Sequence, residues 1–318
     1  MTQERFEARY GQDWDAFEAR LQALEKRGGK LAADEDFPAA YRTVCKHLAL
    51  ARDRGYSAHM VDRLNGLVRR GHGLLYVSRG FGFKTFARFF LVDFPRAVRA
   101  ESFLVVICML LFYGPFLGAA FSIRINEDLV YAFLDPAQVA SMEEMYTPEA
   151  QEQRTISHDL AMFGFYIWNN IGIGFRTFAG GLAAGIGSIF LLFFNGLTIG
   201  AVFGHMAGQP MAPMFFRFVS GHGAFELNAI VLAGVSGLRL GSALLFPGRM
   251  TRAQALRERG RDALTIVYGM GFMLLLAAFV EAFWSPRQLD ASIMYGMAGV
   301  LWVLTFAYFL FMGRGHEN

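Results

Sequence analysis

Residues 221–246 read GHGAFELNAIVLAGVSGLRLGSALLF, a run that is apolar enough to cross a bilayer yet carries His222, Glu226, Asn228 and Arg239. About 20 mainly apolar residues span the hydrocarbon core as an α-helix. Because a charged side chain at that depth is energetically expensive, each one is a functional-site candidate by default. The run therefore predicts a membrane-spanning helix with a polar side turned into the protein.

The same mixture of apolar and polar residues extends back to residue 160. Its further polar members are Asn169, Asn170, Arg176, Asn195, His205 and Arg217. Of all 318 residues, 54% are hydrophobic and 18% are charged. An ordinary soluble domain has about 45–50% apolar and about 25% charged residues. We therefore expect an integral membrane protein with a polar interior.

Apolar stretches of spanning length follow Glu101, at residues 102–123, 160–178, 182–206, 223–246, 264–284 and 292–312. They predict an all-α fold, a polytopic membrane bundle of about six spans that occupies residues 101–318. An even number of crossings returns both ends of the bundle to the same side of the membrane.

Residues 1–72 are rich in charge and contain few long apolar runs. Apolar residues recur at helical spacing in residues 13–26, 38–54 and 59–70, and a turn is expected at Gly28 and Gly29. Helices with one apolar stripe bury that stripe against one another. We expect an N-terminal cytoplasmic helical domain of three helices.

Residues 73–100 are expected to form an interfacial amphipathic helix and its connector to the first span. Within them, residues 79–96 interleave phenylalanines with Arg79, Lys84 and Arg88. Aromatic rings with basic neighbours suit the headgroup boundary of a membrane. A buried helix of a soluble domain is the alternative interpretation.

Charge asymmetry predicts the orientation of the bundle. Arginine is concentrated in residues 247–262, whereas residues 124–160 are acidic. Cytoplasmic loops carry an excess of Lys and Arg. We therefore predict that residues 247–262 and both termini are cytoplasmic, and that the acidic loop, with Glu143, lies outside.

Two prolines interrupt residues 207–221, which join the third and fourth spans. Pro210 and Pro213 are expected to break any helix there. Residues 214–219 are then a candidate half-helix that dips back from the outer face. Such irregular backbone is tolerated at membrane depth only where it is buried in protein or lines a cavity.

Small residues recur at regular spacing on two spans. Gly196, Gly200, Gly204 and Gly208 follow one another every four residues on the third span, and Ala229, Ala233, Gly237 and Gly241 do so on the fourth. This spacing lets helix backbones approach closely. It predicts tight helix contact, either within the chain or with another copy, and we expect a homo-oligomer, most simply a two-fold dimer.

Counting along the antiparallel spans places His205, His222, Glu226 and Glu281 in one outer layer. His222 and Glu226 share a helix face because they are four residues apart. A structural network, a proton- or solute-handling site in a transport path and a metal site all stay open. Two histidines and a carboxylate suit zinc. An intramembrane metal-dependent hydrolase using His205, His222 and Glu226 is therefore one alternative function, and a purely structural scaffold is another.

The other polar residues of the spans receive less specific predictions. Asn195 is expected near mid-membrane. Asn169 and Asn170 either join helices by hydrogen bonds or line a water-filled cavity. Arg239 lies on the side of its helix opposite Glu226, and it is expected to need a carbonyl, a lipid phosphate or an asparagine as its partner.

No Walker A, GxSxG, CxxC or HExxH motif occurs in the sequence, and these motifs carry nucleotide, acyl-transfer, redox and zinc-protease chemistry. The chain is therefore expected to be non-enzymatic, to need no cofactor unless a metal binds, and to depend on a partner for any energy. The net charge of +3 gives no reason to expect a nucleic-acid partner. Basic residues beside the spans indicate membrane lipids instead.

Four segments carry a resemblance to a known family: FPRAVRAE at 94–101, NNIGIGFRTFAGG at 169–181, GAVFGH at 200–205 and GHGAFELNAIVLAGVSGLRLG at 221–241. From about residue 70 to residue 312, the chain resembles the stage II sporulation protein M family. Asn195, His222 and Glu226 match motif positions, but the family supplies no established catalytic residues.

The resemblance implies a polytopic protein of the bacterial inner membrane. The namesake of the family works in a membrane complex with peptidoglycan-degrading partners during engulfment. Relatives in non-sporulating bacteria tend to be encoded beside a MoxR-type ATPase, and this chain looks like that second kind. The working interpretation is a transporter- or channel-like protein, or a subunit of an envelope complex with partner proteins.

Overall fold

The computed structural model describes residues 1–26, 36–76, 82–147, 155–287 and 289–315. Every regular element in these ranges is helical, which confirms the all-α class. The chain divides into two compact units, Met1–Phe83 and Lys84–Asn318.

The N-terminal unit contains the three expected helices, α1 (Gln3–Lys26), α2 (Phe37–Asp53) and α3 (Ala58–Tyr76). Their core includes Phe6, Trp14 and Leu64, all fully buried. Because Phe6 extends the apolar stripe toward the N-terminus, α1 begins at Gln3 and not at residue 13. The turn expected at Gly28 and Gly29 lies outside the described residues.

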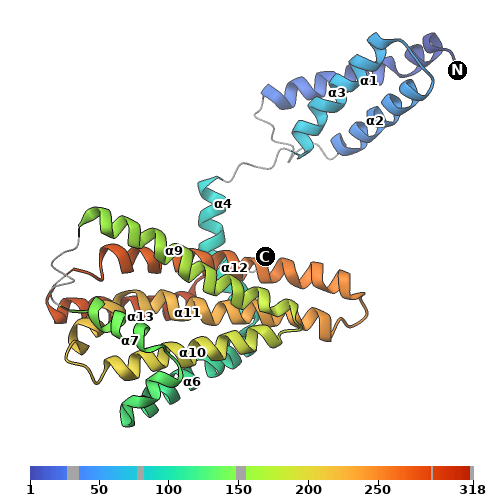
Figure 1. Ribbon diagram of the computed structural model, residues 1–318. Helices are drawn as coiled ribbons and strands as arrows, with labels where there is room; N and C mark the ends of the chain where they lie inside the picture. Colours follow the sequence, from blue (N-terminus) through green and yellow to red (C-terminus); the bar gives the residue numbers. More distant parts are fainter. Residues whose placement is uncertain (27–35, 77–81, 148–154, 288, 316–318) are drawn as a thin grey trace. The chain divides into compact units, whose positions relative to one another are not determined.

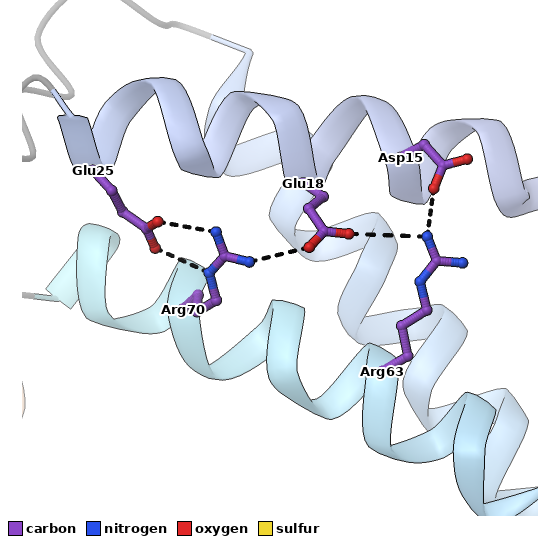
Figure 2. A network of polar contacts seen from close by, with 5 residues as sticks. All are labelled: Asp15, Glu18, Glu25, Arg63 and Arg70. Carbon is purple, nitrogen blue, oxygen red and sulfur yellow. Dashed lines mark hydrogen bonds and ion pairs between the residues drawn. The ribbon is translucent and has the colours of Figure 1, made fainter.

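Ion pairs join α3 to α1 along one side of this unit (Figure 2). Arg70 binds Glu25 with two hydrogen bonds of 3.0 and 2.9 Å, and its third contact is Glu18 at 3.3 Å. Arg63 pairs with Asp15 and lies 3.9 Å from Glu18. The hydrogen bond from Arg70 lowers the pKa of Glu25 below its ordinary value. Exposed pairs of this kind contribute about 0–1 kcal/mol each, so the apolar core dominates the stability.

A helical segment of three parts leads into the second unit: α4 (Phe83–Arg88), the π-helical turn η1 (Phe89–Asp93) and α5 (Phe94–Ala100). Phe83 is exposed, whereas Phe94 is fully buried against Gly269 of α12 (Arg252–Phe283). The Tyr308 hydroxyl donates a 2.6 Å hydrogen bond to the Phe90 carbonyl. The described part of the expected interfacial segment is therefore helical, and its second half packs into the bundle.

Helices of the bundle lie side by side, and each runs opposite to the one before it in the chain (Figure 1). They are α6 (Ser102–Ile125), α9 (Ile156–Ala179), α10 (Ile186–Met206), α11 (Ala212–Leu245), α12 (Arg252–Phe283) and α13 (Ala291–Phe311). The short helices η2 (Glu127–Ala132) and α7 (Pro136–Met145) lie at one end, called here the α7 end, and η3 (Gly180–Leu182) lies at the other, the α5 end. The central helix is α11, which contacts all the others of the bundle.

Among the described residues, five helices are long and apolar enough to cross a membrane, namely α6, α10, α11, α12 and α13. The expected second span, α9, has 24 residues but does not reach the same apolarity. Its adjacent Asn169 and Asn170 lower its mean hydropathy. It nevertheless packs against both α11 and α12, as a span of the bundle would.

The connection between α10 and α11 is shorter than expected. The helix α11 runs without a break from Ala212 to Leu245, so the half-helix expected at residues 214–219 is wrong. Pro213 lies in the first turn of α11, where backbone N–H groups form no hydrogen bond within the helix, so a proline there removes none. Pro210 precedes the helix.

Candidate functional site

Three ionisable side chains from two helices meet in the half of the bundle nearer the α7 end. One ligand atom from each of His222, Glu226 and Glu281 lies within 4.8 Å of the others. His222 and Glu226 lie one turn apart on α11, with 3.6 Å between His222 Nε2 and Glu226 Oε2. Glu281 reaches them from the last turn of α12, which runs antiparallel to α11.

The helix α9 contributes an amide to this group. Asn170 is buried, and its Nδ2 donates a 3.3 Å hydrogen bond to Glu281 Oε2. Asn169 in turn donates to Asn170 Oδ1 across 3.0 Å. Of the two roles left open for the asparagine pair, Asn170 thus makes a hydrogen bond between helices. This hydrogen bond favours the orientation that Glu281 has in the structure.

The orientation of the His222 ring is set by a contact beyond the three-residue group. Ser285 is buried, and its Oγ lies 3.2 Å from His222 Nδ1. The ring of Phe218, one turn earlier on α11, packs edge-on against the imidazole at 5.6 Å. The side chain of His222 is only 7% exposed and that of Glu226 is 18% exposed. The second ring nitrogen, Nε2, therefore faces the carboxylates.

Close packing of α12 on α11 explains why the group forms at this level. A Cβ atom at Gly221 would lie 3.3 Å from both Trp284 Cδ1 and Val280 Cγ1. A glycine next to His222 thus lets the end of α12 approach closely. Glu281 and Ser285 are four residues apart. The close approach places both of them opposite the face of α11 that carries His222.

The charge of the group is uncompensated by protein cations. Within the described part of the chain, no Lys or Arg forms an ion pair with Glu226 or Glu281. Two carboxylates in a poorly hydrated site need either protons or a bound cation, because unpaired buried charge is costly. Chemically, the arrangement can hold a small cation and present it to α9, α11 and α12 together.

His205 does not join this group. Its Nε2 lies 2.7 Å from Glu143 Oε1 of α7, and its side chain is buried in that contact. A metal centre made of His205, His222 and Glu226 is therefore not what the geometry offers; Glu281 takes the place expected for His205. The contact of Glu143 with His205 could not be predicted from helix spacing, because α7 belongs to the connection between two spans.

Two further candidates lie apart from the group. Asn195 Nδ2 donates to the Leu191 carbonyl of its own helix at 2.7 Å. Arg239 lies toward the α5 end, where its Nε is 3.0 Å from Glu101 Oε1 and its Nη2 is 3.2 Å from Asp262 Oδ2. The partners of Arg239 are thus two carboxylates and not the carbonyl, phosphate or asparagine expected.

Ser285 is the member of the site that sequence reasoning missed. It lies beyond the last turn of α12, so it was not counted with the span. Its spacing of four residues from Glu281 is the signal that points to a shared face.

Each of the two parts of the chain matches a known protein family. Residues 102–286, more than half of the chain, match the family of stage II sporulation protein M. Residues 4–77 match a domain of unknown function, DUF8413.

A protein of Methanocaldococcus jannaschii, Uncharacterized protein MJ0793, is 23% identical over 128 residues, which cover 39% of this chain and 71% of the relative. No solved structure gave a significant match. The region matched to the family includes His222, Glu226 and Glu281. It also includes the membrane-capable helices α6, α10, α11 and α12, but not α13. This chain is an α-helical membrane protein that belongs to the stage II sporulation protein M family.

Proposed function

We propose that this protein is a non-enzymatic, transporter- or channel-like component of the bacterial inner membrane, and that its His222–Glu226–Glu281 group holds the cation that it handles. The observation that carries the proposal is that two carboxyl groups and a histidine lie together inside an apolar bundle, with no Lys or Arg of the described residues paired to the carboxyl groups. Ionisable residues within spans commonly mark ion and proton pathways.

The arrangement of the helices supports a role that involves movement. Glu226 belongs to the central helix, Glu281 to the end of α12, and the orienting Asn170 to α9. A small displacement of one helix would separate the ligands, and cation binding would favour the arrangement that holds them together. A site shared by several helices therefore suits gating or alternating access better than a fixed scaffold does.

We further propose that the N-terminal unit lies in the cytoplasm and serves as a contact for partner proteins, including a MoxR-type ATPase system. This proposal rests on the family membership, on the charged surface of α1–α3 and on the lack of nucleotide-binding motifs in the sequence. Co-purification from native membranes, with and without residues 1–83, tests it; recovery of the same partners without the unit would contradict it.

Reconstitution into liposomes tests the transport proposal. We expect the wild-type protein to dissipate an imposed cation gradient, measured with entrapped dyes for protons, Na⁺, K⁺ and divalent ions. Glu226→Gln keeps the side-chain volume and removes the charge, so it should reduce the flux about tenfold or more.

Glu143→Gln is the matched control. It removes a carboxylate at the same end of the bundle, one that pairs with His205 and not with the group. Flux equal to that of protein-free liposomes for every ion tested would refute the transport proposal. Equal loss of flux in the control variant would show that the group has no special role.

A further inference from the structure

We propose that the cation held by His222, Glu226 and Glu281 is a divalent transition-metal ion of the Zn²⁺ or Mn²⁺ type. This inference rests on the proposed cation-handling function and names the class of its cation. It differs from the sequence expectation in the identity of the third ligand, which is Glu281 from α12.

The donor atoms select this class of ion. One imidazole nitrogen and two carboxylate oxygens form a mixed nitrogen and oxygen set, which suits Zn²⁺, Mn²⁺ and related ions. Alkali ions and Ca²⁺ prefer sites made of oxygen alone, so the buried imidazole disfavours them. Two carboxylates and a neutral imidazole also match the charge of a divalent cation.

The imidazole is arranged as metal-binding histidines usually are. His222 is buried, and its Nδ1 lies 3.2 Å from Ser285 Oγ. In the described part of the chain, Nε2 makes no hydrogen bond and points toward Glu226 Oε2 at 3.6 Å. When a hydroxyl contacts one ring nitrogen, the ring is held in place and the lone pair of the other nitrogen is available to bind a metal. This pattern is typical of metal-binding histidines.

The carboxylates are supported in a comparable way. Asn170 Nδ2 occupies one side of Glu281 Oε2, and the helix α11 carries Glu226 on the same face as His222. Such second contacts fix the orientation of the ligands, and removal of one commonly lowers metal affinity by about 10- to 100-fold.

The separations are close to those that a metal ion requires. Ligand atoms bound to Zn²⁺ at about 2.0–2.1 Å in a tetrahedral site lie about 3.3 Å apart. The His222–Glu226 separation of 3.6 Å is near this value, and all three ligand atoms lie within 4.8 Å of one another. For all three atoms to bind one ion, the Glu281 carboxylate would have to move closer to His222 and Glu226. Three protein ligands leave a coordination position for water or for a ligand on the path of the ion.

Zn²⁺ binding to the detergent-purified full chain tests this inference. The protein is stripped with EDTA, dialysed against Zn²⁺ alone, and its metal content is measured by mass spectrometry. We expect about one ion per chain, with affinity reduced about tenfold or more in Glu281→Gln and in His222→Gln.

His205→Gln is the matched control, since it removes an equally buried histidine at the same end of the bundle that is outside the group. It should bind Zn²⁺ as the wild type does. Equal loss of binding in the control, or unchanged binding in Glu281→Gln, would overturn the assignment.

A folding defect is separated from lost ligation by melting each protein with and without Zn²⁺. A ligand that binds the native state raises the melting temperature. We expect Zn²⁺ to raise that of the wild type and of His205→Gln but not that of Glu281→Gln. Absence of any shift in a folded wild-type protein would contradict the metal site.

The liposome assay keeps the two proposals distinguishable. Glu226-dependent proton flux without Zn²⁺ or Mn²⁺ binding would refute the metal and leave the transport function intact. Stoichiometric metal binding without any flux would support the metal site and refute transport. Failure of both measurements would refute both proposals.

Discussion

Gly200 of α10 lies directly against the backbone carbonyl of Phe116 in α6, so closely that a Cβ atom at residue 200 would overlap it. Gly196 meets the backbone of Phe112 one turn away in the same manner. The tight helix contact predicted from the glycine spacing is confirmed, and its partner lies within the chain. These glycines therefore give no support to a homo-oligomer, which stays a proposal.

We predict that Gly200→Leu disrupts the pairing of α6 with α10. The added side chain has no space at the Phe116 carbonyl, and overpacking of this kind costs about 1–3 kcal/mol. The variant should melt several degrees lower than the wild type in detergent. Gly118→Ala is the control, because nothing lies within 4 Å of the position of its Cβ. A control that melts as low as Gly200→Leu would contradict the contact.

Acid should weaken the N-terminal unit through His47. The Trp14 Nε1–H donates a 3.0 Å hydrogen bond to His47 Nδ1, so the imidazole must be neutral. Burial lowers the pKa of His47 below its ordinary value. A depressed histidine pKa means that the unfolded chain binds the proton more tightly. Stability from this residue is complete above about pH 6.5 and falls as the pH drops further, by at most about 1.4 kcal/mol per pH unit.

Hydrogen exchange of α1 and α2 in the full chain measures this effect at pH 7.5 and pH 5.5, after correction for intrinsic exchange. His47→Gln should reduce the pH dependence, since glutamine does not titrate. An equal dependence in the variant would assign the effect to other groups. The ion pairs of Figure 2 act at lower pH, where Glu25 takes up its proton.

Replacement of Arg239 should destabilise the α5 end of the bundle. Its guanidinium joins Glu101 at the start of α6 to Asp262 of α12. The Glu101 side chain is only 16% exposed, so removal of Arg239 would leave a largely buried carboxylate without its partner. We expect the free energy of unfolding to fall by about 1–2 kcal/mol, between the values for surface and buried ion pairs. Arg239→Met should therefore lower the melting temperature and Arg239→Lys should restore part of it.

Arg176→Met provides the comparison for Arg239. The Arg176 side chain is exposed and bonds to the Gly172 carbonyl of its own helix, so its removal should leave the melting temperature nearly unchanged. If both variants melt alike, the pairing of Arg239 contributes nothing measurable.

Cysteine labelling tests the orientation predicted from the arginine-rich loop. In a variant without Cys45 and Cys108, a cysteine in place of Arg257 should react with an impermeant maleimide only from the cytoplasmic side. A cysteine in place of Glu144 should react only from the outside. Glu144 is used because Glu143 contacts His205. Labelling of residue 144 from the cytoplasm would reverse the topology.

The membrane class, the helical fold and most helix positions follow from the sequence alone. Span length and apolarity are local properties, so α6, α10 and α13 lie close to the predicted ranges. The prediction for α12 was wrong at its start, because the helix begins at Arg252 and includes most of the arginine-rich segment that was expected to be a loop. Two helices differ from the prediction for equally local reasons. The helix α1 starts earlier because Phe6 continues its apolar stripe, and α11 starts at Ala212 because Pro213 is compatible with a first helical turn. The spacing of His222 and Glu226 placed both on one face, as the structure has them.

Which side chains meet depends on how the helices pack in three dimensions. Residue counting gave His205 and Glu281 the same depth, but depth does not say which helix lies next to α11 at that level. The order of helices around the bundle brings Glu281 to His222 and leaves His205 beside Glu143 on α7. The same order places α6, and not a helix of another chain, against Gly200. These choices depend on the packing of whole helix surfaces, which no single stretch of sequence contains.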